Sequence, residues 1–93
     1  MNSKNKFYLT KEDKDFLRET GYSDDDFLQI EEAVRRSKYY LIDNQRISYQ
    51  KAIEILGKNT FLSGISRSAF HWTAERESDE GRLVFFDSSI LFK

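Results

Sequence analysis

His71 is the only histidine among the 93 residues of the chain, and Ser68 lies three residues before it. On a helix these two side chains share a face, the arrangement that a serine nucleophile and its histidine base require. The sequence offers no third group to orient the histidine and no segment typical of an oxyanion hole. We therefore predict that the chain is not an enzyme.

The run Asp24-Asp25-Asp26 is the second candidate for chemistry, as a metal site or an acid catalyst. It follows Ser23 at the expected start of a helix, where acidic side chains interact favourably with the helix dipole. A zinc site takes four ligands, and the chain has one histidine and no cysteine. It also has no glycine-rich phosphate-binding motif. We predict that these acids cap a helix and that the chain takes no metal and no cofactor.

Charge is distributed unevenly along the chain, although the net charge is only −1. Residues 1–34 hold five Lys or Arg and nine Asp or Glu, a balance of −4. Residues 35–76 hold eight Lys or Arg and three Asp or Glu, a balance of +5. Residues 77–93 hold two Lys or Arg and four Asp or Glu, a balance of −2. A local basic segment can attract a polyanion even when the whole protein is slightly acidic. The central segment is therefore the candidate for contact with nucleic acid.

Two stretches of this basic segment resemble the two halves of a bacterial helix-turn-helix. They are Ala52-Ile-Glu-Ile-Leu-Gly57 and Ile65-Ser-Arg-Ser-Ala-Phe-His-Trp-Thr-Ala74, and the seven residues 58–64 separate them. The resemblance implies a recognition helix that starts at Ser66 and offers its first turn to DNA. A hairpin near residues 73–86 would complete the order of a winged helix-turn-helix.

The resemblance also implies which side chains contact the nucleic acid. On the recognition helix these are Ser66, Arg67, Ser68 and His71. The side chains implied to bind backbone phosphates are Arg35, Arg36, Lys38, Arg46, Lys51 and Lys58. The predicted function is thus that of a small DNA- or RNA-binding or regulatory protein that uses residues 48–76.

A purely structural role and a protein partner are the two alternatives. In the first, the aromatic residues of 65–74 are core and Arg67 is a solvated charge. In the second, the chain is a protein-interaction module, because exposed tyrosine and tryptophan often anchor interfaces. The candidate anchors are Tyr39, Tyr40, Tyr49 and Trp72. The run 61–72 also resembles small uncharacterised proteins of bacterial mobile elements, which suggests an inhibitor of a host protein.

Four helices are predicted to position these residues, each from a capping residue followed by apolar residues at helical spacing. They span residues 10–20, 24–42, 48–57 and 66–76. Their predicted N-caps are Thr10, Ser23, Ser48 and Ser66. A short turn before the fourth helix should bury Phe61 and Leu62.

Strands are predicted near both ends of the chain. Residues 83–86 are the clearest candidate and follow a turn at 78–81, and residues 90–92 and 7–9 are two more. The predicted fold is a single α+β domain over residues 1–93, mainly helical, with about four helices and a C-terminal β-hairpin. The chain has no cysteine, no signal-peptide core and no apolar run of about 20 residues. These features predict a cytoplasmic protein without a membrane partner.

Overall fold

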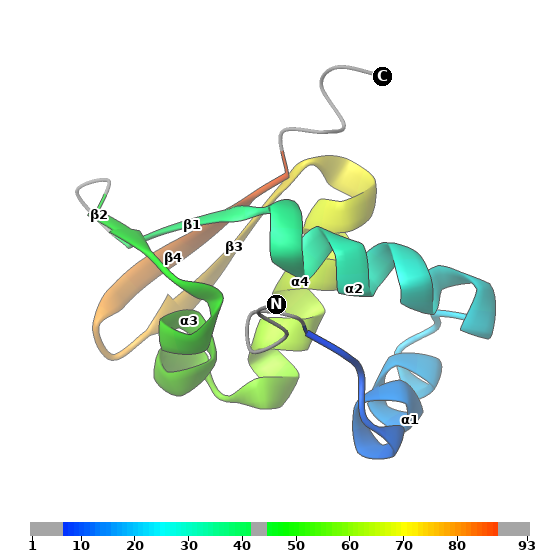
Figure 1. Cartoon of the computed structure of the whole chain (residues 1–93). Helices are drawn as coiled ribbons and strands as arrows, with labels where there is room; N and C mark the ends of the chain where they lie inside the picture. The colour runs from blue at the N-terminus through cyan, green and yellow to red at the C-terminus, as the bar shows by residue number, and fades with distance from the viewer. Residues whose placement is uncertain (1–6, 42–44, 88–93) are drawn as a thin grey trace, which may run out of the picture.

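The computed structural model describes residues 7–41 and 45–87 of the chain (Figure 1). The helices are α1 (Lys11–Glu19), the short 3-10 helix η2 (Asp24–Asp26), α2 (Phe27–Arg36), α3 (Tyr49–Leu56) and α4 (Lys58–His71). The strands are β1 (Lys38–Leu41), β2 (Gln45–Ile47), β3 (Thr73–Ser78) and β4 (Gly81–Phe86). They form one antiparallel sheet in the order β2-β1-β4-β3. The predicted α+β class is confirmed, with four α-helices in the described ranges and β3-β4 as the C-terminal hairpin.

The helix α4 is the centre of the core. It packs against β3 and β4 on one side and contacts α1, α2 and α3 on its other sides, so the helices lie on one side of the sheet (Figure 1). Phe61 of α4 meets Tyr39 of β1 and Phe85 of β4, each pair with ring centroids 5.7 Å apart. Gly64 makes the closest approach, because a Cβ atom there would overlap the Phe85 ring. The missing side chain lets α4 lie directly on the sheet.

The predicted caps of the first two helices are confirmed. Thr10 Oγ1 accepts a hydrogen bond from the Asp13 amide at 3.1 Å, and Asp13 Oδ2 accepts one from the Thr10 amide at 3.0 Å. Asp26 Oδ2 accepts from the Ser23 amide in the same way, also at 3.0 Å. The acidic run therefore starts a helix, as predicted. The first helix ends as predicted too, with Gly21 at a φ of 108°.

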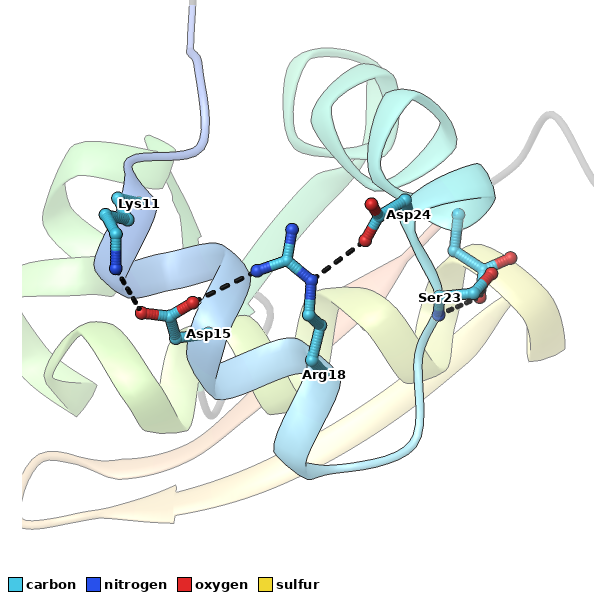
Figure 2. Close-up of polar contacts among 6 residues, drawn as sticks. Lys11, Asp15, Arg18, Ser23 and Asp24 are labelled. Atoms are coloured by element: carbon cyan, nitrogen blue, oxygen red, sulfur yellow. Dashed lines mark hydrogen bonds and ion pairs between the residues drawn. The ribbon is translucent and has the colours of Figure 1, made fainter.

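An exposed chain of ion pairs connects α1 to the start of η2 (Figure 2). Lys11 pairs with Asp15 at 3.1 Å, and Arg18 bridges Asp15 at 3.0 Å and Asp24 at 2.9 Å. The hydrogen bond from Arg18 to Asp24 raises the pKa of the guanidinium above its usual value. Because exposed ion pairs add little to stability, this chain orients the two helices more than it stabilises them.

The predicted helix over 24–42 is wrong beyond Arg36. Ser37 is extended, with a ψ of 157°, and residues 38–41 form β1. The spacing between Val34 and Leu41 fits a helix, but Tyr39 and Leu41 are both buried while Tyr40 between them is partly exposed. This alternation is that of a strand. Pairing with β2 and β4 therefore decides the structure of these residues.

The predicted break between the third and fourth helices is also wrong. The third helix starts at Ser48 as predicted, where Ser48 Oγ accepts from the Lys51 amide at 3.1 Å, and it ends at Gly57. The next helix follows at once and runs without interruption through residues 58–64. Phe61 and Leu62 are fully buried, as predicted, but within α4. No proline interrupts residues 58–64, and Gly57 alone, at a φ of 88°, makes the turn.

Of the three predicted strands, one is confirmed, one is wrong and one lies outside the described residues. Residues 83–86 lie in β4 and 78–81 make the turn before it, which confirms both predictions. Residues 7–9 are not a strand, since the Leu9 amide donates to the Glu31 carboxylate at 2.8 Å and the Phe7 carbonyl accepts from Arg35 at 3.0 Å. Residues 90–92 lie outside the described ranges. The end of the fourth helix, predicted near 76, comes at His71 because residues 73–78 pair with β4.

Candidate interaction surface

The predicted recognition helix does not start at Ser66, and this changes which side chains are accessible. Ser66 and Ser68 lie inside α4, and their hydroxyls donate to the carbonyls of Ser63 and Ile65 at 3.2 and 3.1 Å. The exposed fractions of the two serines are 1 % and 0 %, so the prediction that they face a ligand is wrong. Arg67 and His71 do share an exposed face of α4, one helical turn apart.

The other basic residues predicted to bind phosphates come from five different elements of the fold, namely α2, β1, β2, α3 and α4. Four of them contact groups of the protein itself. Arg35 donates to the Phe7 carbonyl at 3.0 Å, and Arg36 pairs with Asp87 at 2.9 Å. Lys51 pairs with Glu54 at 3.6 Å, and Lys58 pairs with the nearly buried Asp13 at 3.2 Å. The remaining two, Lys38 and Arg46, lie on the sheet.

The ion pair between Arg36 and Asp87 joins the end of α2 to the end of β4. The Nε atom of Arg36 lies 2.9 and 3.0 Å from the two carboxylate oxygens of Asp87, whose side chain is fully buried. The Asp87 amide donates to the Trp72 carbonyl at 2.8 Å. Because a buried carboxylate without a cation is strongly destabilising, Arg36 has a structural role.

Of the four predicted aromatic anchors, two serve the core. Tyr39 is 3 % exposed and its hydroxyl donates to the Val34 carbonyl at 2.8 Å, so burial raises the pKa of the phenol well above its usual value. Tyr49 packs edge-on against Phe7 with ring centroids 5.8 Å apart. Trp72 is exposed, and Tyr40 is partly exposed like Tyr49 but does not pack against the core. Adjacent tyrosines on a strand point to opposite sides, which explains why only one is buried.

Tyr40 belongs to the side of the sheet that the helices leave bare. We call this side the outer sheet face. It consists of the side chains that alternate with the buried ones along the four strands: Lys38, Tyr40, Arg46, Thr73, Glu75, Glu77, Arg82, Val84 and Phe86. Strand pairing places Tyr40 beside Val84, and Lys38 beside Phe86. The centre of the face is thus apolar and aromatic.

Trp72 stands at one end of the outer sheet face in a strained backbone conformation. Its φ is 64°, and within the described ranges it has the only positive φ outside glycine. Its ring meets the Phe86 ring edge-on, with centroids 5.7 Å apart, and the residue is 42 % exposed. A bulky residue in the left-handed region at a helix end takes a place that favours glycine or asparagine.

Charges of opposite sign lie at opposite sides of the outer sheet face. On β1 and β2, Lys38 and Arg46 have no ion pair with another described residue. On β3, Glu75 and Glu77 both approach Arg82 of β4, at 3.7 and 3.3 Å. The β2 side of the face is therefore basic, and the β3 side is acidic with one neutralising arginine.

The described residues also bear on three other kinds of feature: a serine nucleophile, a metal site and a membrane-spanning helix. Ser68 is buried and its hydroxyl donates to the Ile65 carbonyl at 3.1 Å, whereas His71 is exposed. Within residues 7–41 and 45–87, no three His, Cys, Asp or Glu side chains gather where they could hold a metal ion. No helix in these ranges is long and apolar enough to cross a membrane.

Comparison with models of protein families, with curated proteins and with solved structures finds no match to this chain. The candidate surface is therefore defined by its own geometry and chemistry.

Sequence reasoning missed most of the outer sheet face. Val84, Phe86 and Glu75 were not candidates, because residues 83–86 are a continuous apolar run whose sequence does not show which side chains are buried. The face was not predicted because residues 38–41 were assigned to a helix. That assignment removed the central strand to which β4 pairs.

Proposed function

We propose that this chain is a non-enzymatic protein-interaction module whose contact surface is the outer sheet face together with Trp72. The observation that carries the proposal is the conformation of Trp72, which combines a φ of 64° with 42 % exposure. A left-handed backbone at a residue other than glycine costs roughly 1–2 kcal/mol. Local backbone preference does not explain a tryptophan here, and its ring is only partly buried against Phe86, whereas tryptophan is a frequent anchor of protein interfaces.

The neighbours of Trp72 support the same function. Phe86 lies against it, and Tyr40 and Val84 continue the apolar surface across β1 and β4. Around this centre stand charged residues of both signs. An aromatic centre with a charged rim is the usual composition of a protein interface.

A nucleic-acid partner has less support. Affinity for nucleic acid depends on several cations that neutralise phosphates. The outer sheet face carries three cations and two acids, and Arg82 already lies against both acids. Arg67 and His71 lie on α4, which is on the helix side of the sheet. The helix-turn-helix prediction therefore stays a prediction, and the experiment below includes it.

Site-specific photo-crosslinking tests the proposal. A benzophenone amino acid replaces Val84 on the outer sheet face, and in a control chain it replaces the exposed Glu12 of α1. Both chains are expressed in the cells that carry the gene, and captured proteins are identified by mass spectrometry. The captured protein is then purified, and its affinity is measured for the wild type and for Trp72→Ala, Tyr40→Ala and Arg67→Ala.

We expect capture from position 84 and not from position 12. Trp72→Ala should weaken the measured affinity at least about 10-fold, while Arg67→Ala should change it less than about 2-fold. Duplex and single-stranded DNA are titrated in parallel at low and moderate salt. Salt-dependent DNA binding that Arg67→Ala abolishes, with no effect of Trp72→Ala, would overturn the proposal in favour of the helix-turn-helix prediction.

A further inference from the structure

We propose that the protein which covers the outer sheet face is a second copy of this chain, related by a two-fold axis that runs along the strands between β1 and β4. The inference rests on the proposed function, because it names the partner for the same surface. It is carried by the order of side chains across the four strands. That order makes the face complementary to itself.

One row of the face shows the complementarity directly. Strand pairing places Arg46, Tyr40, Val84 and Glu75 side by side across β2, β1, β4 and β3. A two-fold axis between the central strands exchanges β2 with β3 and β1 with β4. Arg46 of one copy then lies over Glu75 of the other, and Tyr40 lies over Val84. The cation at one edge thus meets the acid at the other, twice in each dimer.

The neighbouring row fits the same axis. Lys38, Phe86 and Thr73 follow one another across β1, β4 and β3. The axis places Lys38 over the Phe86 ring of the other copy, where an ammonium group is attracted to the aromatic face. Lys38 has no ion pair with another described residue, so this contact breaks no ion pair of Lys38.

The charge pattern also selects this axis from the alternatives. A two-fold axis across the strands would keep each strand over its own copy, with Arg46 over Arg46 and Glu75 over Glu75. Like charges placed opposite each other disfavour that arrangement. The axis along the strands keeps the strand directions of the two sheets nearly parallel, as in aligned sheet packing about 10 Å apart.

The size of the face predicts a weak dimer. Four strands about 4.8 Å apart and about five residues long give a flat face of roughly 300 Å². Two such faces give roughly 600 Å², which is below the size of stable specific interfaces and corresponds to a weak, transient contact. The dimer should therefore form in the micromolar range or above and dissociate on dilution.

A charge exchange between two variants tests the proposal. Arg46→Glu places two acids opposite each other in the dimer, and Glu75→Arg places two cations opposite each other. Each single variant should dissociate at least about 10-fold more readily than the wild type in sedimentation velocity. Their equimolar mixture should form heterodimers, because both charge pairs are restored. The double variant Arg46→Glu/Glu75→Arg should dimerise alone, and Arg67→Glu should behave as the wild type.

Cross-linking between the two edge strands fixes the axis by distance. The chain has no cysteine, so Arg46→Cys and Glu75→Cys each introduce a single thiol. The proposed axis places residue 46 directly over residue 75 of the other copy, whereas residue 46 of the other copy lies over the opposite edge of the sheet. A short bis-maleimide should therefore join the two variants in a mixture far better than it joins either variant to itself. Preferential joining of Arg46→Cys to itself would overturn the proposed axis. Circular dichroism checks that each variant is folded.

Two outcomes separate this inference from the proposed function. If the wild type stays monomeric up to about 1 mM, the second copy is not the partner. The proposed function still stands in that case if position 84 captures a different protein whose binding depends on Trp72. If nothing is captured and no dimer forms, both proposals fail.

Discussion

Tyr39 and Tyr40 are neighbours on β1, yet they lie on opposite faces of the sheet, and only one of these faces is covered by helices. Tyr39, with Leu83 and Phe85, lies on the inner face of the sheet, where none of the three is more than 3 % exposed. Tyr40, with Val84 and Phe86, lies on the outer sheet face and is partly exposed. Both faces are apolar and aromatic. Only the inner one is covered, because α3 and α4 pack on that side of the sheet.

The difference teaches that apolar residues at the centre of a sheet face do not by themselves make that face part of the core. The inner face lies against a helix whose Gly64 permits close contact, and Phe61 of that helix completes an aromatic cluster. The outer sheet face receives no helix from the described residues and carries charges at its edges instead. An apolar surface of this kind in a folded chain is typical of a binding surface.

Gly64→Ala should have the largest effect, because it separates the inner face from its helix. The new methyl group would overlap the Phe85 ring, so α4 or the ring must shift. We expect the free energy of unfolding in urea to fall by about 2 kcal/mol. The outer sheet face should keep its partner in any molecules that remain folded.

Phe85→Leu provides the control for this substitution. In a chain that already carries it, Gly64→Ala should cost less, because the smaller side chain leaves room for the methyl group. If Gly64→Ala stabilises the wild type, as alanine does at an unconstrained helix position, the close approach of α4 to the sheet is wrong.

The sequence predicted the parts of this fold that local interactions determine. The caps at Thr10, Ser23 and Ser48 depend on residues within one turn, and all three helices start there. The strand β4 and the turn before it follow from a short apolar run and from polar turn residues. Patterns of this kind need no knowledge of distant partners.

The errors arose where distant residues decide the structure. Residues 38–41 fit a helix by spacing, but their neighbours in β2 and β4 make them a strand. Ser66 fits a helix cap, but α4 continues through it because apolar residues on both sides of it, such as Leu62 and Ala69, are buried in the core. Two of the predicted anchors, Tyr40 and Trp72, do reach the candidate surface. Their common position could not be found before strand pairing was known.

Tyr39→Phe should have an intermediate effect and tests the inner face by pH. Loss of the hydrogen bond to the Val34 carbonyl should lower stability by about 1 kcal/mol at neutral pH. Burial raises the pKa of Tyr39 above its ordinary value of 10.0, so above that pH the unfolded state loses the proton first. The contribution of Tyr39 to wild-type stability should therefore be constant below about pH 10 and fall above it, by up to about 1.4 kcal/mol per pH unit.

Urea titrations at several alkaline pH values separate the two tyrosines. In Tyr39→Phe the loss of stability above pH 10.0 should be reduced, because the buried phenol is gone. In Tyr40→Phe the loss should persist, since Tyr39 still carries it. Equal behaviour of the two variants would mean that the faces of the sheet do not differ in burial as described.

Trp72 gives the smallest expected effect and the sharpest test of the outer sheet face. Trp72→Ala removes the ring and keeps a side chain at a φ of 64°, whereas Trp72→Gly removes both the ring and the strain. After the greater freedom of glycine in the unfolded chain is allowed for, Trp72→Gly should be more stable than Trp72→Ala by roughly 0.5–1 kcal/mol.

The same pair of substitutions at the exposed helical residue Arg67 should give the opposite order, with alanine more stable than glycine by about 1 kcal/mol. Urea denaturation of the four variants measures both differences. A reversal of sign between the two sites would show that position 72 favours glycine, as the proposed function requires. The same order at both sites would remove the backbone strain, and with it the observation that carries the proposed function.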